Sequence, residues 1–142
     1  MSQKQKILVI DDSVKSVEFL EGFLFEVGFD VLKAYNGKEA IETVKKDRPD
    51  LILLDIMMPE MDGLQVCETL RKDSDISSTP IIMVTAVDKD HDIVTSLERG
   101  ADDYIVKPVI LKELLNKVND LLSKAKTGQL PSQQYFKKLN AG

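Results

Sequence analysis

The chain has 142 residues, of which 43% are hydrophobic and 30% charged, and its 19 Lys and Arg against 24 Asp and Glu give a formal net charge of -5. This composition is typical of one soluble globular domain and excludes an intrinsically disordered chain. The acidic balance argues against direct binding of nucleic acid, because neutralising phosphates requires clustered cations. The single Cys and the single His exclude an internal disulfide and any metal site that needs several thiolates or two imidazoles.

Hydropathy along the chain gives no membrane span. The longest apolar runs, such as Leu51 to Leu54, have only four residues. The amino terminus leads into four apolar residues and then two aspartates, which is not the pattern of a signal peptide. We therefore expect a cytoplasmic protein that does not contact a membrane.

Short strand-like segments alternate with segments of helical spacing. The predicted strands are Lys6 to Ile10, Asp30 to Ala34, Leu51 to Leu54, Ile81 to Thr85 and Tyr104 to Val106. The predicted helices are Val14 to Val27, Gly37 to a point before Pro49, Leu64 to Lys72, Asp90 to Arg99 and Leu111 to Ala125. Three strands are continuously apolar, as parallel strands covered on both faces are. Strict alternation of five strands and five helices predicts a doubly wound parallel sheet.

Polar residues stand at the carboxyl ends of four of these strands. They are Asp11 and Asp12, Asp55, Thr85 and Lys107, whereas the second strand ends in Ala34 and Tyr35. Ligands of open parallel sheets bind at the carboxyl ends, where the strand order reverses. The pattern suits the order 2-1-3-4-5, in which the first and third strands are neighbours.

In that order, three carboxylates would converge. Two like charges about 4 Å apart cost on the order of 4 kcal/mol at an effective dielectric near 20, so one carboxyl must be protonated or a cation must be bound. Oxygen-only ligands favour Mg²⁺ or Mn²⁺, and Lys107 adds a second cation for an anionic group such as phosphoryl. Each residue alone has an ordinary alternative: Asp11 or Asp12 as a helix cap, Asp55 in a turn, Thr85 as a strand-end hydroxyl and Lys107 as a solvated lysine.

The sequence resembles the receiver domain of two-component response regulators, a chemotaxis-Y-like family with a flavodoxin-like fold. The motifs that carry the resemblance are Ile7 to Asp12, Leu53 to Gly63, Thr85-Ala86 and Gly100 to Pro108, and the match runs from about Lys6 to Ser123. The resemblance implies that Asp55 is the phosphoacceptor and that Asp11, Asp12, Asp55 and the backbone carbonyl of Met57 hold Mg²⁺. It also implies that Thr85 and Lys107 contact the phosphoryl group, that Tyr104 switches with Thr85, and that the Lys107-Pro108 bond is cis.

The function implied by the resemblance is signalling rather than enzymatic turnover. A sensor histidine kinase or a phosphotransfer protein would phosphorylate Asp55, and the face formed by the fourth helix, fifth strand and fifth helix would change. That face would contact a target protein, an output domain or a second copy of the chain. The chain departs from a common family pattern at Val109, where many members carry an aromatic residue after the Lys-Pro pair.

Other classes fit the motifs less well. An aspartate-nucleophile phosphatase of the haloacid-dehalogenase type needs an Asp-x-Asp pair, which Asp11-Asp12-Ser13 does not provide. A flavodoxin-like electron carrier would place two anions against the flavin phosphate. Within the receiver class, a stand-alone regulator and the receiver of a longer regulator both stay open.

The last residues differ in composition from the rest. We predict a receiver domain over residues 1–126 and a linker or tail over 127–142, interrupted by Gly128 and Pro131. Ser132 is expected to cap a short helix, Gln133 to Leu139, whose apolar residues need a packing partner. This pattern favours a chain that is part of a larger protein.

Overall fold

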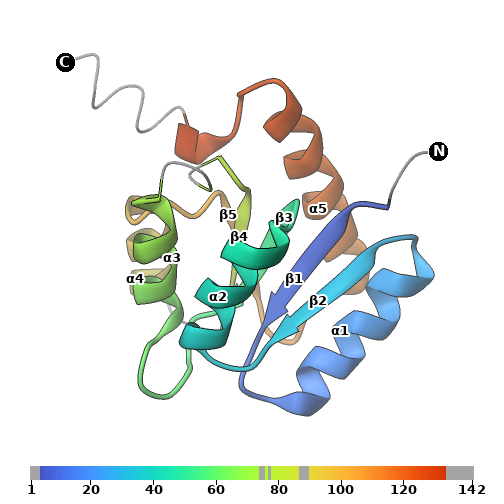
Figure 1. Ribbon diagram of the computed structural model, residues 1–142, viewed down its shortest axis with the longest axis horizontal. Helices are drawn as coiled ribbons and strands as arrows, with labels where there is room; N and C mark the ends of the chain where they lie inside the picture. Colours follow the sequence, from blue (N-terminus) through green and yellow to red (C-terminus); the bar gives the residue numbers. More distant parts are fainter. Residues whose placement is uncertain (1–3, 74–75, 77, 87–89, 134–142) are drawn as a thin grey trace.

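The computed structural model describes residues 4–73, 76, 78–86 and 90–133, without the side chains of 90–92. Five parallel strands form one sheet in the order β2-β1-β3-β4-β5, which confirms the predicted topology (Figure 1). The strands are β1 (Lys6–Ile10), β2 (Asp30–Ala34), β3 (Leu51–Asp55), β4 (Ile81–Thr85) and β5 (Asp103–Val106). Because β1 and β3 are neighbours, the residues at their carboxyl ends lie side by side.

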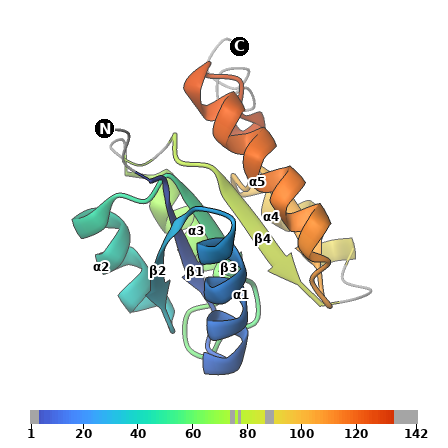
Figure 2. The same cartoon turned by 90° about the vertical axis from the view of Figure 1, so that its right-hand side faces the viewer.

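Helices cover both faces of the sheet, as Figures 1 and 2 show. The helices are α1 (Val14–Glu26), α2 (Gly37–Asp47), α3 (Gly63–Arg71), α4 (Asp90–Glu98) and α5 (Leu111–Lys126). One core cluster lies between the sheet and α2 and α3, and a second lies between the sheet and α1 and α5. Helix α4 lies beside α3. The fold is therefore the predicted flavodoxin-like three-layer arrangement.

Burial explains the sequence patterns and corrects one of them. Every residue of β3 and β4 is buried, so these strands are continuously apolar up to the polar residue at their ends. In α1, Val17, Leu20 and Leu24 are buried as their spacing predicts. Val14 and Val27 continue the same three- and four-residue spacing of apolar residues, but they are 53% and 40% exposed, because Val14 is the first residue of α1 and Val27 its C-cap.

The chain beyond α5 packs back onto the domain. Leu130 is fully buried in the core cluster on the α1 and α5 face. Helical backbone resumes at 131, and the side chain of Gln133 accepts a hydrogen bond from the Leu130 N–H at 3.1 Å. Pro131 thus begins a helical turn, since its missing N–H costs nothing at the first position. The expectation that Ser132 caps this segment is wrong, because Ser132 is itself inside the turn.

Most of the short helix expected from Gln133 to Leu139 lies outside the described residues. The predicted end of the receiver domain at residue 126 stays a prediction. Leu130 lies beyond that boundary and is nevertheless fully buried. No helix in the described part of the chain is both long and apolar enough to cross a membrane.

Candidate functional site

Two aspartates lie at the carboxyl ends of the neighbouring strands β1 and β3. Asp11 follows β1 and Asp55 ends β3, and each is only 4% exposed. The N-cap of α1 is Ser13, whose hydroxyl accepts the Ser16 N–H at 3.3 Å. The helix-cap alternative for Asp11 and Asp12 is therefore wrong, although Asp11 Oδ1 does accept the Ser13 N–H at 2.9 Å. The other oxygen of Asp11, Oδ2, faces Lys107.

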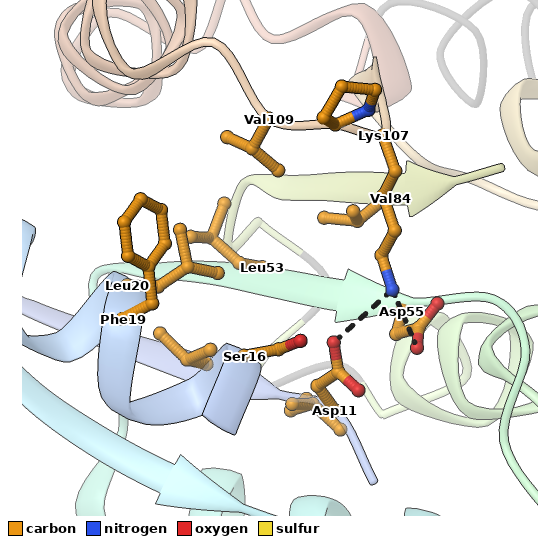
Figure 3. Close-up of a pocket in the computed structure, with 12 residues that line it drawn as sticks. Asp11, Ser16, Phe19, Leu20, Leu53, Asp55, Val84, Lys107 and Val109 are labelled. Atoms are coloured by element: carbon orange, nitrogen blue, oxygen red, sulfur yellow. Dashed lines mark hydrogen bonds and ion pairs between the residues drawn. The ribbon is translucent and has the colours of Figure 1, made fainter. Parts of the chain in front are cut away.

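Lys107 lies between these two carboxylates. Its Nζ is 3.4 Å from Asp11 Oδ2 and 3.4 Å from Asp55 Oδ2, as the dashed lines in Figure 3 mark. Lys107 stands directly after β5, and its peptide bond to Pro108 is cis. The carboxyl ends of three strands thus meet at one point. Because Lys107 faces two carboxylates, the cluster has more negative than positive charge.

The loop after β3 closes tightly around Asp55. The Met57 N–H donates to Asp55 Oδ1 at 3.2 Å, and the Gly63 N–H donates to the Ile56 carbonyl at 2.9 Å. A Cβ at residue 63 would overlap the Asp55 carbonyl oxygen and come within 2.8 Å of the Ile56 Cα. Glycine at this position is therefore required for the loop and the start of α3 to approach the Asp55 backbone.

Burial and charge disturb the ionisation of this cluster. The pKa of Asp55 is raised from 3.8 to about 6, chiefly by burial and then by the nearby Asp11 carboxylate, while Lys107 and the Met57 N–H act to lower it. Burial alone would lower the pKa of Lys107, but the Asp55 and Asp11 carboxylates raise it on balance. The charged form of Asp55 is therefore disfavoured, as expected for a site where a further cation would bind.

The donor set fits a hard divalent cation. Carboxylate oxygens of Asp11, Asp12 and Asp55 all lie within 4.8 Å of one another, and Asp12 is exposed at the mouth of the site. Oxygen-only donors with an exposed edge suit Mg²⁺, which retains several waters. Met57 has an exposed side chain, and its backbone stands next to Asp55 through the hydrogen bond described above.

The side chains of Thr85 and Tyr104 lie on the face of the sheet that α2 and α3 cover. Thr85 is 1% exposed, and its hydroxyl is 3.5 Å from the Ala86 carbonyl. By strand alternation Thr85 shares a face with Met83, which packs in the α2 and α3 cluster together with Tyr104. The Lys117 Nζ lies 4.8 Å from the centre of the Tyr104 ring. The structure thus brings Asp11, Asp12, Asp55 and Lys107 together, and places Thr85 and Tyr104 beside but not inside that cluster.

A cavity beside the acid cluster was not foreseen from the sequence. It has a volume of about 190 Å³, and α1 contributes Phe19 and Leu20 to its wall. The buried residues of α1 are Val17, Leu20 and Leu24, and the helix carries three phenylalanines besides them, Phe19, Phe23 and Phe25. Three phenylalanines are more than one buried helix face requires, and this excess was the signal in the sequence for an apolar surface outside the core. Phe19 is indeed 57% exposed.

Comparisons with known proteins agree with this geometry. The family described as the response regulator receiver domain matches residues 7–119. The three-layer fold and the acid cluster at the switch point of the sheet are those of a receiver domain. The chain belongs to the receiver domain family of two-component response regulators. Proteins of this family are regulatory rather than conventional enzymes.

Two solved structures illustrate the likeness. The receiver domain of response regulator 1452 from Francisella is 36% identical, with a TM-score of 0.78, and the match covers 85% of this chain and 98% of that one. The chemotaxis protein CheY4 from Vibrio cholerae is 29% identical, with a TM-score of 0.80, and the match covers 84% of this chain and 99% of that one.

Curated relatives are longer than this chain. Proteins named "probable transcriptional regulator ycf27" from Porphyridium aerugineum and Pyropia yezoensis are 49% and 47% identical over 120 and 124 residues. The matches cover 84% and 87% of this chain, but only 49% and 50% of those relatives. The chain therefore spans about half the length of the curated relatives that it matches.

Proposed function

We propose that Asp55 is the phosphoacceptor of this receiver domain and that Asp11, Asp12, Asp55 and the backbone carbonyl of Met57 hold Mg²⁺. The observation that carries the proposal is the pairing of two buried carboxylates, Asp11 and Asp55, around the single Lys107 amine. The cluster is short of positive charge, and its oxygen donors suit Mg²⁺ before Mn²⁺. When bound, the cation neutralises charge that develops on the transferring phosphoryl oxygens.

In the proposed reaction an Asp55 carboxylate oxygen attacks phosphorus. The donor is a phosphohistidine of a sensor kinase or of a phosphotransfer protein. The phosphorus–nitrogen bond breaks, and the imidazole leaves with the electron pair, so that an acyl phosphate forms on Asp55. Lys107 pairs with the transferred group, because it already stands 3.4 Å from Asp55.

Signalling would follow from a response of Thr85 and Tyr104 to the new phosphoryl oxygens. Thr85 ends β4 next to β3, and Tyr104 lies on β5 on the same face of the sheet. A movement of both would alter the surface of α4, β5 and α5, which is available for a target, an output domain or a second copy. The matches cover about half the length of the transcriptional regulators, which favours an output domain in this protein rather than a stand-alone regulator that acts by protein contact.

Intact-mass spectrometry after incubation with acetyl phosphate and Mg²⁺ tests the proposal. We expect one added phosphate on the wild-type chain and none on Asp55→Asn. Asp120→Asn is the matched control, because Asp120 is an exposed aspartate on α5 whose carboxylate contacts only Lys124 among the ion pairs described. Equal labelling of wild type and Asp55→Asn would remove Asp55 from the proposed role.

A further inference from the structure

The cavity beside the acid cluster is apolar over most of its wall. Val9, Leu53 and Val84 of the sheet line it, together with Phe19 of α1 and Val109 after β5. Its volume of about 190 Å³ exceeds that of an apolar cavity of about 150 Å³ that is known to bind benzene. The cavity therefore has room for a ring of six carbons against the sheet.

The remaining wall of the cavity is ionic. Asp11, Asp55 and Lys107 line this end, and Figure 3 shows them on the opposite side from Phe19. Asp11 and Asp55 are each 4% exposed, and the Lys107 Nζ is 3.4 Å from one oxygen of each. Because the pKa of Asp55 is about 6, its carboxylate is mainly ionised at about pH 8. Two buried carboxylates then share one amine, and this end of the cavity attracts a further positive charge.

The two ends of the cavity together select one class of ligand. An anionic head group would be repelled by Asp11 and Asp55, and a neutral one would leave their excess charge uncompensated. A metal ion would neutralise the carboxylates but leave the apolar space unfilled. A protonated primary amine supplies a positive charge and three N–H donors, and an attached ring fills the apolar space.

We propose that this cavity binds small primary ammonium compounds that carry a compact aromatic group, with the ring against the sheet and the ammonium beside Asp11 and Asp55. Benzylammonium is a simple member of this class, since one methylene joins its ring to its amine. The ring gains by leaving water, and the ammonium forms charge-assisted hydrogen bonds with the carboxylates. The inference requires only the cavity and its charges, so it does not depend on Asp55 accepting a phosphoryl group.

A set of four small molecules tests the inference on the wild-type chain. Affinities are measured by NMR chemical-shift titration in buffer without Mg²⁺ at about pH 8. Benzylammonium should bind at least about tenfold more tightly than benzyl alcohol, because hydrogen bonds to charged groups contribute more than neutral ones. Methylammonium should also bind at least about tenfold more weakly than benzylammonium, because it buries no ring. Phenylacetate, which carries the ring and a negative charge, should not bind.

Three results of this titration would overturn the inference. They are the absence of saturable benzylammonium binding, an equal affinity for benzyl alcohol, and an equal affinity for methylammonium. None of them bears on the labelling of Asp55 by acetyl phosphate, which is measured separately, so a failure here is distinct from a failure of the proposed phosphoacceptor.

A charge variant locates the ammonium. Asp55→Asn should weaken benzylammonium binding severalfold and leave the affinity for benzyl alcohol unchanged, because only the ammonium uses the lost charge. Asp120→Asn is the matched control, since it removes a carboxylate of α5 that pairs with Lys124. Equal benzylammonium affinity in Asp55→Asn and the wild type would contradict the placement of the ammonium.

A second pair of variants locates the ring. Val109→Phe fills part of the apolar space and should weaken the binding of benzylammonium and of benzyl alcohol severalfold. Ile110→Phe is the matched control, because Ile110 is 61% exposed and is not among the residues that line the cavity. If Val109→Phe does not fold, Phe19→Ala replaces it, because Phe19 lines the cavity but is 57% exposed. Wild-type affinity for both ring compounds in the folded variant would overturn the inference.

Discussion

Two buried ionic clusters lie at opposite ends of the sheet. At the amino end of β4, Arg71 Nη2 is 2.8 Å from Asp102 Oδ2, and the two side chains are 3% and 0% exposed. Asp102 also accepts the N–H groups of Ile81 and Ser132, each at 2.9 Å. Arg71 donates two further hydrogen bonds, to the carbonyls of Gly100 and Thr79. Among the described residues the Arg71 guanidinium pairs with the Asp102 carboxylate, and the geometry is that of a strong, charge-assisted network.

The cluster at the carboxyl ends of the strands also consists of acidic and basic side chains, but it has fewer cations than carboxylates. One amine, Lys107, serves Asp11 and Asp55 at 3.4 Å each, and its side chain is 38% exposed. Asp12 adds a third carboxylate without a further cation in the cluster. The comparison teaches that burial of charge alone does not indicate function. The network of paired charges holds elements together, whereas a cluster short of cations is the place where a ligand is expected to bind.

The largest expected effect comes from breaking the pair of Arg71 and Asp102. Arg71→Met should lower the free energy of unfolding by about 3–5 kcal/mol, because it leaves the Asp102 carboxylate buried without its counter-ion. Urea denaturation followed by circular dichroism measures the loss. Arg99→Met is the control, since Arg99 pairs with Glu68 at 3.1 Å on the surface and should cost less than about 1 kcal/mol. Similar losses in the two variants would contradict the distinction between the clusters.

A second large effect concerns the chain after α5 that the network of paired charges holds. Leu130→Ala should lower the free energy of unfolding by about 2–4 kcal/mol, because Leu130 is fully buried and its truncation leaves a cavity. The same denaturation experiment applies. Leu97→Ala is the control, as Leu97 is 39% exposed on α4 and should change stability little. A negligible loss in Leu130→Ala would mean that residues 129–133 do not pack on the domain in solution.

In the cluster at the carboxyl ends of the strands, removal of a charge should stabilise the fold. Without Mg²⁺ at pH 7, Asp55→Asn should raise the free energy of unfolding by about 1–3 kcal/mol, the equivalent of a pKa raised by up to about two units. The pKa of Asp55 is raised from 3.8 to about 6, so the folded state binds more protons than the unfolded state between these values. The wild type therefore loses stability as the pH rises through that window.

Denaturation from pH 3 to pH 8 checks the sign. The advantage of Asp55→Asn should be absent below about pH 4, where Asp55 is protonated in both states, and complete above about pH 6. Asp120→Asn is the control, because it removes an exposed carboxylate of α5 and leaves the acid cluster unchanged. An advantage for Asp55→Asn that grows toward low pH would contradict the raised pKa.

The smallest effect on stability is expected at Asp12. Asp12 is exposed, so that Asp12→Ala should change the free energy of unfolding by less than about 0.5 kcal/mol without Mg²⁺. Calorimetric titration should nevertheless show at least about tenfold weaker Mg²⁺ binding, because one of three carboxylate ligands is lost. Glu18→Ala, at an exposed position of α1, should bind Mg²⁺ as the wild type does. Equal affinity in Asp12→Ala and the wild type would exclude Asp12 from the ligand set.

Local chemistry explains what the sequence predicted. The order of strands and helices follows from apolar periodicity, and Asn36 and Glu39 mark the start of α2 because both side chains satisfy nearby N–H groups. The convergence of Asp11, Asp55 and Lys107 was predictable because each stands at the carboxyl end of a strand, and parallel strands end at one edge of the sheet. The helix start needs only a segment and its immediate neighbours, and the convergence needs only the order of the strands.

Contacts between distant segments were decided by the tertiary structure alone. Arg71 and Asp102 are 31 residues apart, and no local pattern on α3 indicates that its last residue reaches the loop before β5. Leu130 lies between Gly128 and Pro131, a context that is equally typical of a linker until the burial of Leu130 is known. The cavity beside Asp55 depends on how closely α1 and Val109 approach the sheet. Close packing is a property of all the side chains that share a space, so its gaps and pairings are fixed only when every element is in place.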